Sequence, residues 1–437
     1  RRHSFPTRRS SDLLWFLLTP RFSWRTRLAG LAILALLAVG MKLTVRVKGT
    51  MDGTGLPRLA WKWSGARAGL AVPPLLTGPN SVADDPRLSQ AAEVPQFFGP
   101  QRDGTVTGAK LSRDWSTRPP RELWRQPVGE GWSAFAVVRG LAFTQEQRGD
   151  DELVSCYNLF TGQLRWAHAD KARFSQWQSG DGPHATPAVG GGRVYAYGGT
   201  GLLSCLDAAT GRLLWQRSVL AENQLSNLEW GLSASPLLVD DKVIVTGGKT
   251  KGPVLFAYQR DTGTPVWKAG GDQATYASPV LAGGNLLAWM RNQLWLLDAK
   301  GSVLASRPLR SGMDASVNAA TPVPVGGDRW LVSAGYGVGA HLLKVDDGKI
   351  ESIWQKEDTL DCHYNTPIRV GEHLYAFHGR QETGMKLRCI RIEDGSVAWT
   401  ASDSLPGGTL LAVGDKLLVV TEQGELWIVR ATPERFD

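Results

Sequence analysis

One short pattern recurs along the chain and restricts its fold more than any other feature. A turn of the type Asp-x-x-Thr-Gly, or a shortened Asp-Gly version, is followed a few residues later by tryptophan, as in DAATGRLLW. In such turns the Asp side chain accepts backbone N–H bonds and the Gly takes a left-handed conformation. The pattern therefore predicts a tight turn and then a strand that carries a large apolar side chain. The tryptophans of this pattern are Trp166, Trp215, Trp267, Trp354 and Trp399, and a degenerate copy ends at Leu304.

A second pattern marks the start of each repeat. A Ser or Thr followed by Pro opens a strand where no ladder N–H is needed. These pairs recur every 43 to 49 residues, at Thr186-Pro187, Ser235-Pro236, Ser278-Pro279, Thr321-Pro322 and Thr366-Pro367, with Ala134-Phe135 and Thr409-Leu410 as equivalents without Pro. Four strands in each such interval are typical of propeller blades. No unit shows a sustained helical period, which excludes a helical repeat.

We therefore predict an all-β fold, a β-propeller of four-stranded blades over residues 95–437, with seven repeats visible. The number of blades is seven or eight. Residues 122–125, Glu-Leu-Trp-Arg, resemble an isolated outer strand that would complete the last blade and hide both sheet edges. The last unit, GELWIVRATPERFD, has no turn-plus-tryptophan ending, so the alternative is an eighth blade that is truncated in this sequence.

The N-terminal region has a different composition. An uncharged apolar run at residues 28–41 follows Arg21, Arg25 and Arg27, which is the order of a secretory signal. We expect a hydrophobic helix in a signal or anchor segment, residues 14–48, with an uncleaved anchor favoured over a cleaved peptide; a buried core helix is the alternative. Residues 49–94 are interpreted as a linker with little regular structure. Residues 1–13 resemble a translated sequencing adapter and are set apart from the fold.

Charge and cysteine content exclude two further classes. Residues 1–50 carry ten Lys and Arg and one acid, whereas the formal charge of the whole chain is +8. The body is thus almost neutral, which argues against a nucleic-acid-binding propeller. Cys156, Cys205, Cys362 and Cys389 form no Cys-x-x-Cys motif, so zinc and redox motifs are absent. Three of them occupy equivalent repeat positions, and small buried strand residues are favoured there over a disulfide.

These repeats resemble the quinoprotein-like (PQQ-repeat) propellers, and the segments PQFFGPQRDG and TQEQRGDDELVSCYNLFTG resemble a bacterial group of that family with no settled role. The resemblance implies two branches. One contains the pyrroloquinoline-quinone alcohol dehydrogenases, which hold the quinone between a tryptophan and a disulfide of adjacent cysteines, above Ca²⁺. The other contains BamB, a scaffold for outer-membrane protein assembly. The sequence has no adjacent cysteine pair and no calcium-binding pattern, so PQQ and calcium are not supported and a scaffold is favoured over an enzyme.

A candidate site is expected where irregular loops gather. In a four-stranded blade, the loop into the first strand and the loop between the second and third strands share one face, whereas the tight turns lie on the other. We predict no catalytic residue and no metal ligand. For each candidate the ordinary alternative is loop packing, a structural hydrogen bond or an ion pair. The candidate binding residues are Trp132, Gln145, Glu146, Arg148, Asp181, His184, Glu229, Trp230, Tyr276, Asn318, Tyr336, His363 and Asn365.

Together these patterns predict a membrane-anchored or exported binding propeller, on the periplasmic side of the inner membrane. Its partner would be a protein or peptide of the cell envelope, as the resemblance to the BamB branch implies. The alternatives are a quinone-dependent oxidoreductase that uses the same face, and a carbohydrate-binding module, which the aromatic loops suggest.

Overall fold

The computed structural model describes residues 23–51, 56–62, 87, 92–112, 114–249, 252–313, 317–346, 348–402 and 407–436. The chain divides into two units, residues 1–48 with 57–68, and residues 49–56 with 69–437. The segment interpreted as adapter sequence, residues 1–13, lies outside the described residues.

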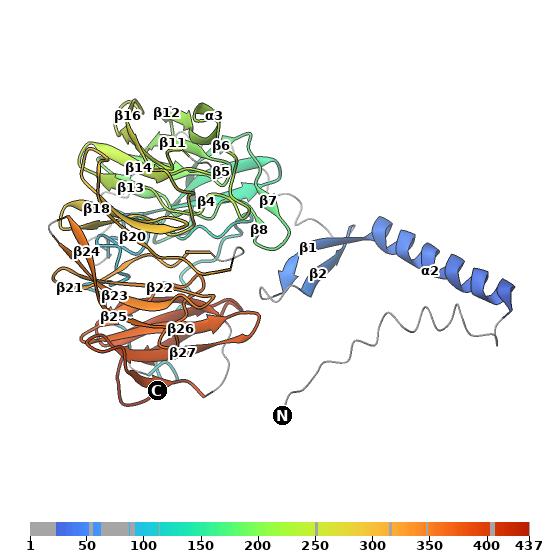
Figure 1. Ribbon diagram of the computed structural model, residues 1–437. Coiled ribbons are helices and arrows are strands. Elements are labelled where there is room, and N and C mark those ends of the chain that lie inside the picture. Colours follow the sequence, from blue (N-terminus) through green and yellow to red (C-terminus); the bar gives the residue numbers. More distant parts are fainter. Residues whose placement is uncertain are drawn as a thin grey trace. The chain divides into compact units, whose positions relative to one another are not determined.

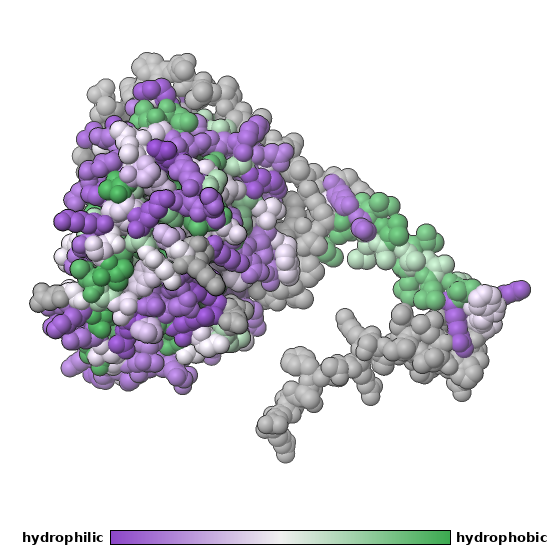
Figure 2. Space-filling view, turned by 45° about the horizontal axis from the view of Figure 1, so that its top comes forward, coloured by the Kyte–Doolittle hydropathy of each residue, from purple (hydrophilic) through white to green (hydrophobic). Residues whose placement is uncertain are grey.

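The predicted hydrophobic helix is present as α2 (Trp24–Thr44). The Ser23 side chain caps it by accepting a hydrogen bond from the backbone N–H of Thr26. None of its residues is buried, and in length and composition it could cross a membrane. Figure 2 shows hydrophobic residues along this helix and hydrophilic residues at both of its ends.

The region interpreted as a linker contains regular structure at its start. Strands β1 (Val45–Met51) and β2 (Leu56–Trp61) form a two-stranded sheet directly after α2. The expectation of little regular structure from residue 49 onward therefore differs from the structure at these positions. Most of the remaining residues up to 91 lie outside the described part of the chain.

The second unit contains seven consecutive antiparallel sheets, arranged as propeller blades (Figure 1). In the described residues, six sheets have four strands and the last has three. The strands are β3 (Ala136–Val138), β4 (Leu141–Arg148), β5 (Asp151–Asn158) and β6 (Leu164–Asp170) in blade 1; β9 (Ala188–Gly190), β10 (Arg193–Tyr197), β11 (Leu202–Asp207) and β12 (Leu213–Ser218) in blade 2; β13 (Leu237–Val239), β14 (Lys242–Thr246), β15 (Leu255–Gln259) and β16 (Pro265–Ala269) in blade 3; and β17 (Val280–Ala282), β18 (Asn285–Trp289), β19 (Gln293–Leu297) and β20 (Val303–Pro308) in blade 4.

The remaining blades continue the same order. Their strands are β21 (Val323–Gly326), β22 (Arg329–Ala334), β23 (Gly339–Asp346) and β24 (Lys349–Lys356) in blade 5; β25 (Ile368–Val370), β26 (His373–Arg380), β27 (Gly384–Arg391) and β28 (Val397–Thr400) in blade 6; and β29 (Gly408–Val413), β30 (Lys416–Thr421) and β31 (Leu426–Arg430) in blade 7. A short hairpin, β7 (Ser175–Gln176) with β8 (Gly180–Asp181), lies between blades 1 and 2, and helix α3 (Val219–Glu222) follows β12.

Each repeat tryptophan lies opposite a residue of the third strand at a β-bulge. Trp166 pairs with Cys156 and Trp215 with Cys205, and in both ladders the register shifts directly after the cysteine. Cys389 stands in the same relation to Trp399. The cysteines are buried and free, as the repeat positions predict, and a small side chain leaves room for the indole across the ladder.

The same tryptophans join neighbouring blades. The indole of Trp166 lies against Gly211 in the turn of blade 2, and its Nε1 donates to the Ala208 carbonyl at 3.0 Å. A Cβ on Gly211 would come within 2.6 Å of the ring. The turn glycine is thus required both by its positive φ and by the indole that covers it. The equivalent contacts are Trp215 on Gly263, Trp267 on Gly301 and Trp354 on Gly395.

The predicted closing strand differs from the structure. Trp124 takes the position of a repeat tryptophan, because its ring covers Gly162 of blade 1 and its Nε1 donates to the Leu159 carbonyl at 2.8 Å. However, residues 122–125 form no strand, and they do not pair with β31. Trp124 therefore makes the predicted contact with blade 1, although residues 122–125 do not pair with the last sheet as a closing strand.

Residues 94–106, which we call the crossing segment, contact the inner strands of blades 1, 2 and 7. Val94 pairs with Val137 of β3, and the backbone N–H of Val189 in β9 donates to the Pro95 carbonyl at 2.8 Å. At its other end, the segment exchanges hydrogen bonds of 2.8 Å with Ala412 of β29, through the Gly104 carbonyl and the Val106 N–H. Between these ends, Arg102 reaches the chain that precedes blades 3 and 4, so the segment crosses the central channel.

Arg102 anchors the middle of the crossing segment. Its guanidinium donates to the carbonyls of Ser235 and Pro236, which precede β13, and of Pro279, which precedes β17. Nε donates to the Gln96 side chain at 3.1 Å. The side chain is almost fully buried, and burial lowers its pKa to about 9. The group is still charged at neutral pH, and the carbonyl dipoles of two blades stabilise it.

Removal of this guanidinium should weaken the propeller. Arg102→Met leaves buried carbonyls of blades 3 and 4 without a donor, and we expect the free energy of unfolding to fall by about 3 kcal/mol. Urea denaturation measures the change. The control is Arg139→Met, because Arg139 also has a positive φ but is exposed; its effect should stay below about 0.5 kcal/mol. Equal effects of both substitutions would contradict the anchoring role.

Candidate binding face

The two ends of the propeller carry different kinds of connection between strands, as the repeat pattern predicts. The tight turns, such as Asp207–Gly211, lie on one end, which we call the turn face. The loops that lead into first strands, and those that join second to third strands, lie on the other end, which we call the loop face. The predicted binding residues lie in these loops or at the strand ends that carry them.

Three of the predicted residues hold the loops together from within. The side-chain amide of Gln145, a buried residue of β4, donates to the Ala185 carbonyl at 2.6 Å. Asn318 donates to the Met290 carbonyl at 2.8 Å, and Asn365 accepts from the backbone N–H of Phe377. All three are buried. Their amides therefore position the loops of successive blades, which is the ordinary alternative for such side chains.

Glu146 and Arg148 form a buried ion pair at the end of β4, with an N–O distance of 2.9 Å. The Glu146 carboxylate also accepts from Ser155 and from the backbone N–H of Gly129, and Tyr157 lies 3.3 Å away. A carboxylate with this many donors is fully engaged. Its role is to fasten the chain that leads to Trp132 onto blade 1.

Trp132 is exposed, and its indole is nevertheless held in place. Two-thirds of its surface is accessible, while Nε1 donates to the Ser179 carbonyl at 2.7 Å. Its backbone N–H donates to the Pro183 carbonyl at 2.9 Å, and the adjacent Glu130 pairs with Gln147 of β4. An exposed aromatic ring fixed on both sides is suited to bind a partner at a low cost in side-chain entropy.

Asp181 and His184 support the hairpin that carries Ser179. The Asp181 carboxylate accepts from Arg173 at 2.6 Å and from Ser175 at 2.7 Å. His184 packs edge-on against Phe174, and burial lowers its pKa to about 4, so the ring is neutral at pH 7. The structure thus brings Trp132, Glu146, Arg148, Asp181 and His184 into one cluster.

A second cluster lies on blades 5 and 6. The Tyr336 hydroxyl is 3.1 Å from His363 Nε2, and His363 Nδ1 is 2.8 Å from Gln381 Oε1. Because the amide oxygen can only accept, His363 Nδ1 donates to it. Arg380 lies over the Tyr336 ring at 4.5 Å. Tyr336 also has a φ of 63°, and such strained residues gather at functional sites.

The remaining predicted residues form a third, smaller contact. Trp230 and Tyr276 have ring centroids 5.6 Å apart, and the Tyr276 hydroxyl accepts from the Trp230 N–H at 3.4 Å. Glu229 is exposed beside them. This pair belongs to blades 3 and 4.

Sequence reasoning missed Trp177, Arg380 and Gln381. Trp177 lies at the tip of the β7–β8 hairpin with 55% of its surface exposed. The sequence could have indicated Trp177 as a candidate, because this tryptophan lies outside every turn-plus-tryptophan pattern, in the polar sequence SQWQSG. Arg380 and Gln381 carry no such signal, since only the hairpin between β26 and β27 brings them to Tyr336 and His363.

The residues do not fit a quinone site of the kind that the family resemblance implies. The four cysteines are free, and each belongs to a different strand or loop. Among the described residues, no group of three His, Cys, Asp or Glu could hold a metal ion. We therefore derive no chemical step through a quinone or calcium.

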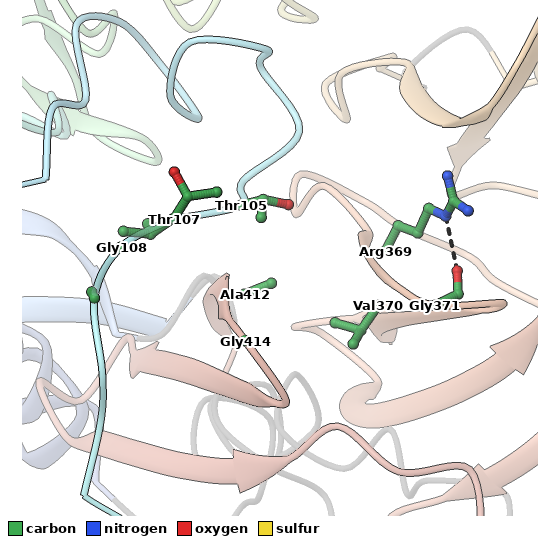
Figure 3. A pocket seen from close by; sticks show the side chains of 10 residues that line it. Thr105, Thr107, Gly108, Arg369, Val370, Gly371, Ala412 and Gly414 are labelled. Carbon is green, nitrogen blue, oxygen red and sulfur yellow. Dashed lines mark hydrogen bonds between the residues drawn. The ribbon is translucent and has the colours of Figure 1, made fainter.

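A pocket of about 390 Å³ lies on the turn face between the crossing segment and blades 6 and 7 (Figure 3). Thr105 and Thr107 line one side, and Arg369 and Val370 line the other. Arg369, the charged residue of this lining, already has partners within the protein. Its Nε donates to the Gly371 carbonyl at 2.8 Å, and its guanidinium is 3.5 Å from Glu372. The pocket thus offers mainly backbone and small side chains.

The ring of turn-plus-tryptophan blades and its one-sided loops define a propeller of the PQQ-repeat class. The family described as outer membrane protein assembly factor BamB matches residues 150–400. The chain belongs to this family. No curated protein matches the sequence.

Solved structures support the fold. BamB from Moraxella catarrhalis is 18% identical, with a TM-score of 0.50 over 69% of this chain and 83% of that chain. Quinohemoprotein alcohol dehydrogenase from Comamonas testosteroni is 13% identical, with a TM-score of 0.59 over 84% and 75% of the two chains. The corresponding enzyme ADHIIG from Pseudomonas putida HK5 is 13% identical, with a TM-score of 0.55 over 82% and 73%. At these identities the likeness is one of fold.

Glu152, at the start of β5, should make stability depend on pH. Burial raises its pKa to about 7, although the Gly199 N–H donates to it. The folded protein therefore holds a proton that the unfolded chain releases near pH 4.5, and stability falls as the pH rises between these values. Relative to the wild type, Glu152→Gln should be equally stable at pH 4.5 and should gain up to about 3 kcal/mol above pH 7. Denaturation at a series of pH values tests this, with the exposed Glu425→Gln as control; a gain that does not depend on pH would contradict it.

Proposed function

We propose that this protein is a binding propeller of the cell envelope that holds a protein or peptide partner on its loop face. The observation that carries the proposal is the difference between the two faces. The crossing segment spans the channel between inner strands, and the turn face beside it consists of tight turns covered by tryptophans. The loop face carries exposed aromatic side chains on loops that buried amides and an ion pair hold in place.

Two further features support this role. Family membership links the chain to an outer membrane protein assembly factor, and assembly of other proteins requires binding to them. Helix α2 has the length and composition of a membrane span. We propose that α2 is a signal anchor and that the propeller acts on the periplasmic side of the inner membrane. The fold alone does not distinguish a scaffold from an enzyme, since dehydrogenases share it.

Site-specific photocrosslinking in cells tests this function. A benzophenone amino acid in place of Trp230 or Tyr364, on the loop face, should give discrete adducts with envelope proteins. The same group in place of Lys300 or Glu393, in exposed turns of the opposite face, should give none. Adducts from the turn face alone would contradict the proposal. So would one tightly bound quinone per chain in the purified protein.

A further inference from the structure

Exposed apolar side chains of the propeller gather beside blade 1. Trp132 and Trp177 expose 66% and 55% of their surfaces, and Phe135 exposes 39%. We call the two indoles the tryptophan platform. They belong to adjacent loops, because Trp132 Nε1 donates to the carbonyl of Ser179, two residues beyond Trp177. Large aromatic side chains left in water on a folded surface mark interaction sites.

The two loops are built to hold this platform. Gly131 and Gly182 have φ values of 143° and 91°, and a Cβ on either would meet the opposite loop at 2.9 Å or closer. The backbones can approach only because both residues are glycine. On the hairpin, Gln176 Oε1 accepts from the N–H of Ser179 at 2.9 Å, and Asp181 joins Arg173 to Ser175.

Three acidic side chains near the platform are paired with basic ones within the protein. Glu146 pairs with Arg148, Asp181 with Arg173 at 2.6 Å, and Asp151 with Lys171 at 2.7 Å. The hairpin tip itself, residues 175–180, contains no charged residue. At the hairpin tip a partner therefore meets an indole with no charged neighbour within residues 175–180, and it gains little there from a charge of its own.

Several polar groups of the hairpin already bond within it. The carboxylate of Asp181, the hydroxyl of Ser175 and the side-chain oxygen of Gln176 all accept or donate hydrogen bonds inside the hairpin. A sugar would need such groups for its hydroxyls, whereas an apolar peptide needs only the indole faces and a few backbone contacts. The geometry therefore favours a peptide over a glycan.

We propose that the tryptophan platform binds an uncharged, apolar peptide segment of the partner. The inference rests on the proposed function, because it names the part of the loop face that makes the anchoring contact and the chemistry of the segment that it takes.

Selection from a random peptide library tests the inference. The probe is a phage-displayed library of peptides of about twelve residues, selected on the full chain in lipid nanodiscs after depletion on empty nanodiscs. We expect enriched peptides to carry several apolar side chains and no net charge. Fluorescence anisotropy of a labelled consensus peptide then gives the dissociation constant, which should change less than about twofold between low and high salt.

Variants locate the binding site. Trp132→Ala and Trp177→Ala should each weaken binding at least about tenfold, as expected for central tryptophan anchors. Ile353→Ala is the matched control, because Ile353 is an exposed apolar residue of β24, on blade 5, and it should leave the dissociation constant unchanged. All three side chains are exposed. The melting temperatures of Trp177→Ala and Ile353→Ala should stay equal to that of the wild type, whereas Trp132→Ala also loses the hydrogen bond to Ser179 and should melt at most about a few degrees lower.

The outcomes separate the inference from the proposed function. Enrichment of charged peptides with salt-dependent affinity, or unchanged binding by both tryptophan variants, would overturn the inference while loop-face crosslinks still support the function. Binding of oligosaccharides in place of peptides, lost in Trp132→Ala, would overturn it in favour of a glycan. If no peptide is enriched and the loop face gives no crosslinks, both proposals fail.

Discussion

The hydrogen bonds of one buried guanidinium organise the centre of this propeller. First strands of blades expose one edge to the channel, and the carbonyls of Pro236 and Pro279 lie just before β13 and β17, outside their ladders. Arg102 supplies donors to these carbonyls from the crossing segment. A buried charge without donors or acceptors around it would be strongly destabilising, so the guanidinium and the carbonyls depend on each other. The same segment pairs with β3 and β29, and blades distant in sequence are thereby fixed in one ring.

The outer part of the ring depends on a different contact. In blades 2, 3, 4 and 6 the turn glycine is covered by the indole of the preceding blade, and the indole N–H donates to a carbonyl at that turn. These blades are thereby joined to their predecessors, and Trp124 supplies the same contact to blade 1 although it belongs to no sheet. Where the repeat lacks its tryptophan, a Cβ on Gly348 would lie 3.7 Å from the Leu304 Cβ, so a smaller apolar side chain covers this turn less closely.

Local patterns predicted the blades because each strand and turn is specified by residues close in sequence. The repeat alone shows that Cys156, Cys205 and Cys389 occupy equivalent positions. The structure gives the reason, because each lies opposite a repeat tryptophan. The crossing segment could not be recognised in the same way. PQFFGPQRDG resembles known sequences, but the partners of Arg102 lie more than 130 residues away in the chain. Strand formation at residues 45–61 was missed because Gly and Pro there resembled a linker.

The candidate site shows the same division between local and long-range information. Trp132, Glu146 and Asp181 were identified as loop residues, but only the fold shows that Glu146 fastens the loop and Trp132 projects from it. Buried polar residues such as Asn318 and exposed aromatic ones such as Trp177 look alike in a sequence, since both are irregular residues between strands. Their roles differ because a buried amide must be paired within the protein, whereas an exposed indole gains its remaining contacts from a partner. A repeat fold thus places its stability in the regular turns and leaves the irregular loops free to carry function.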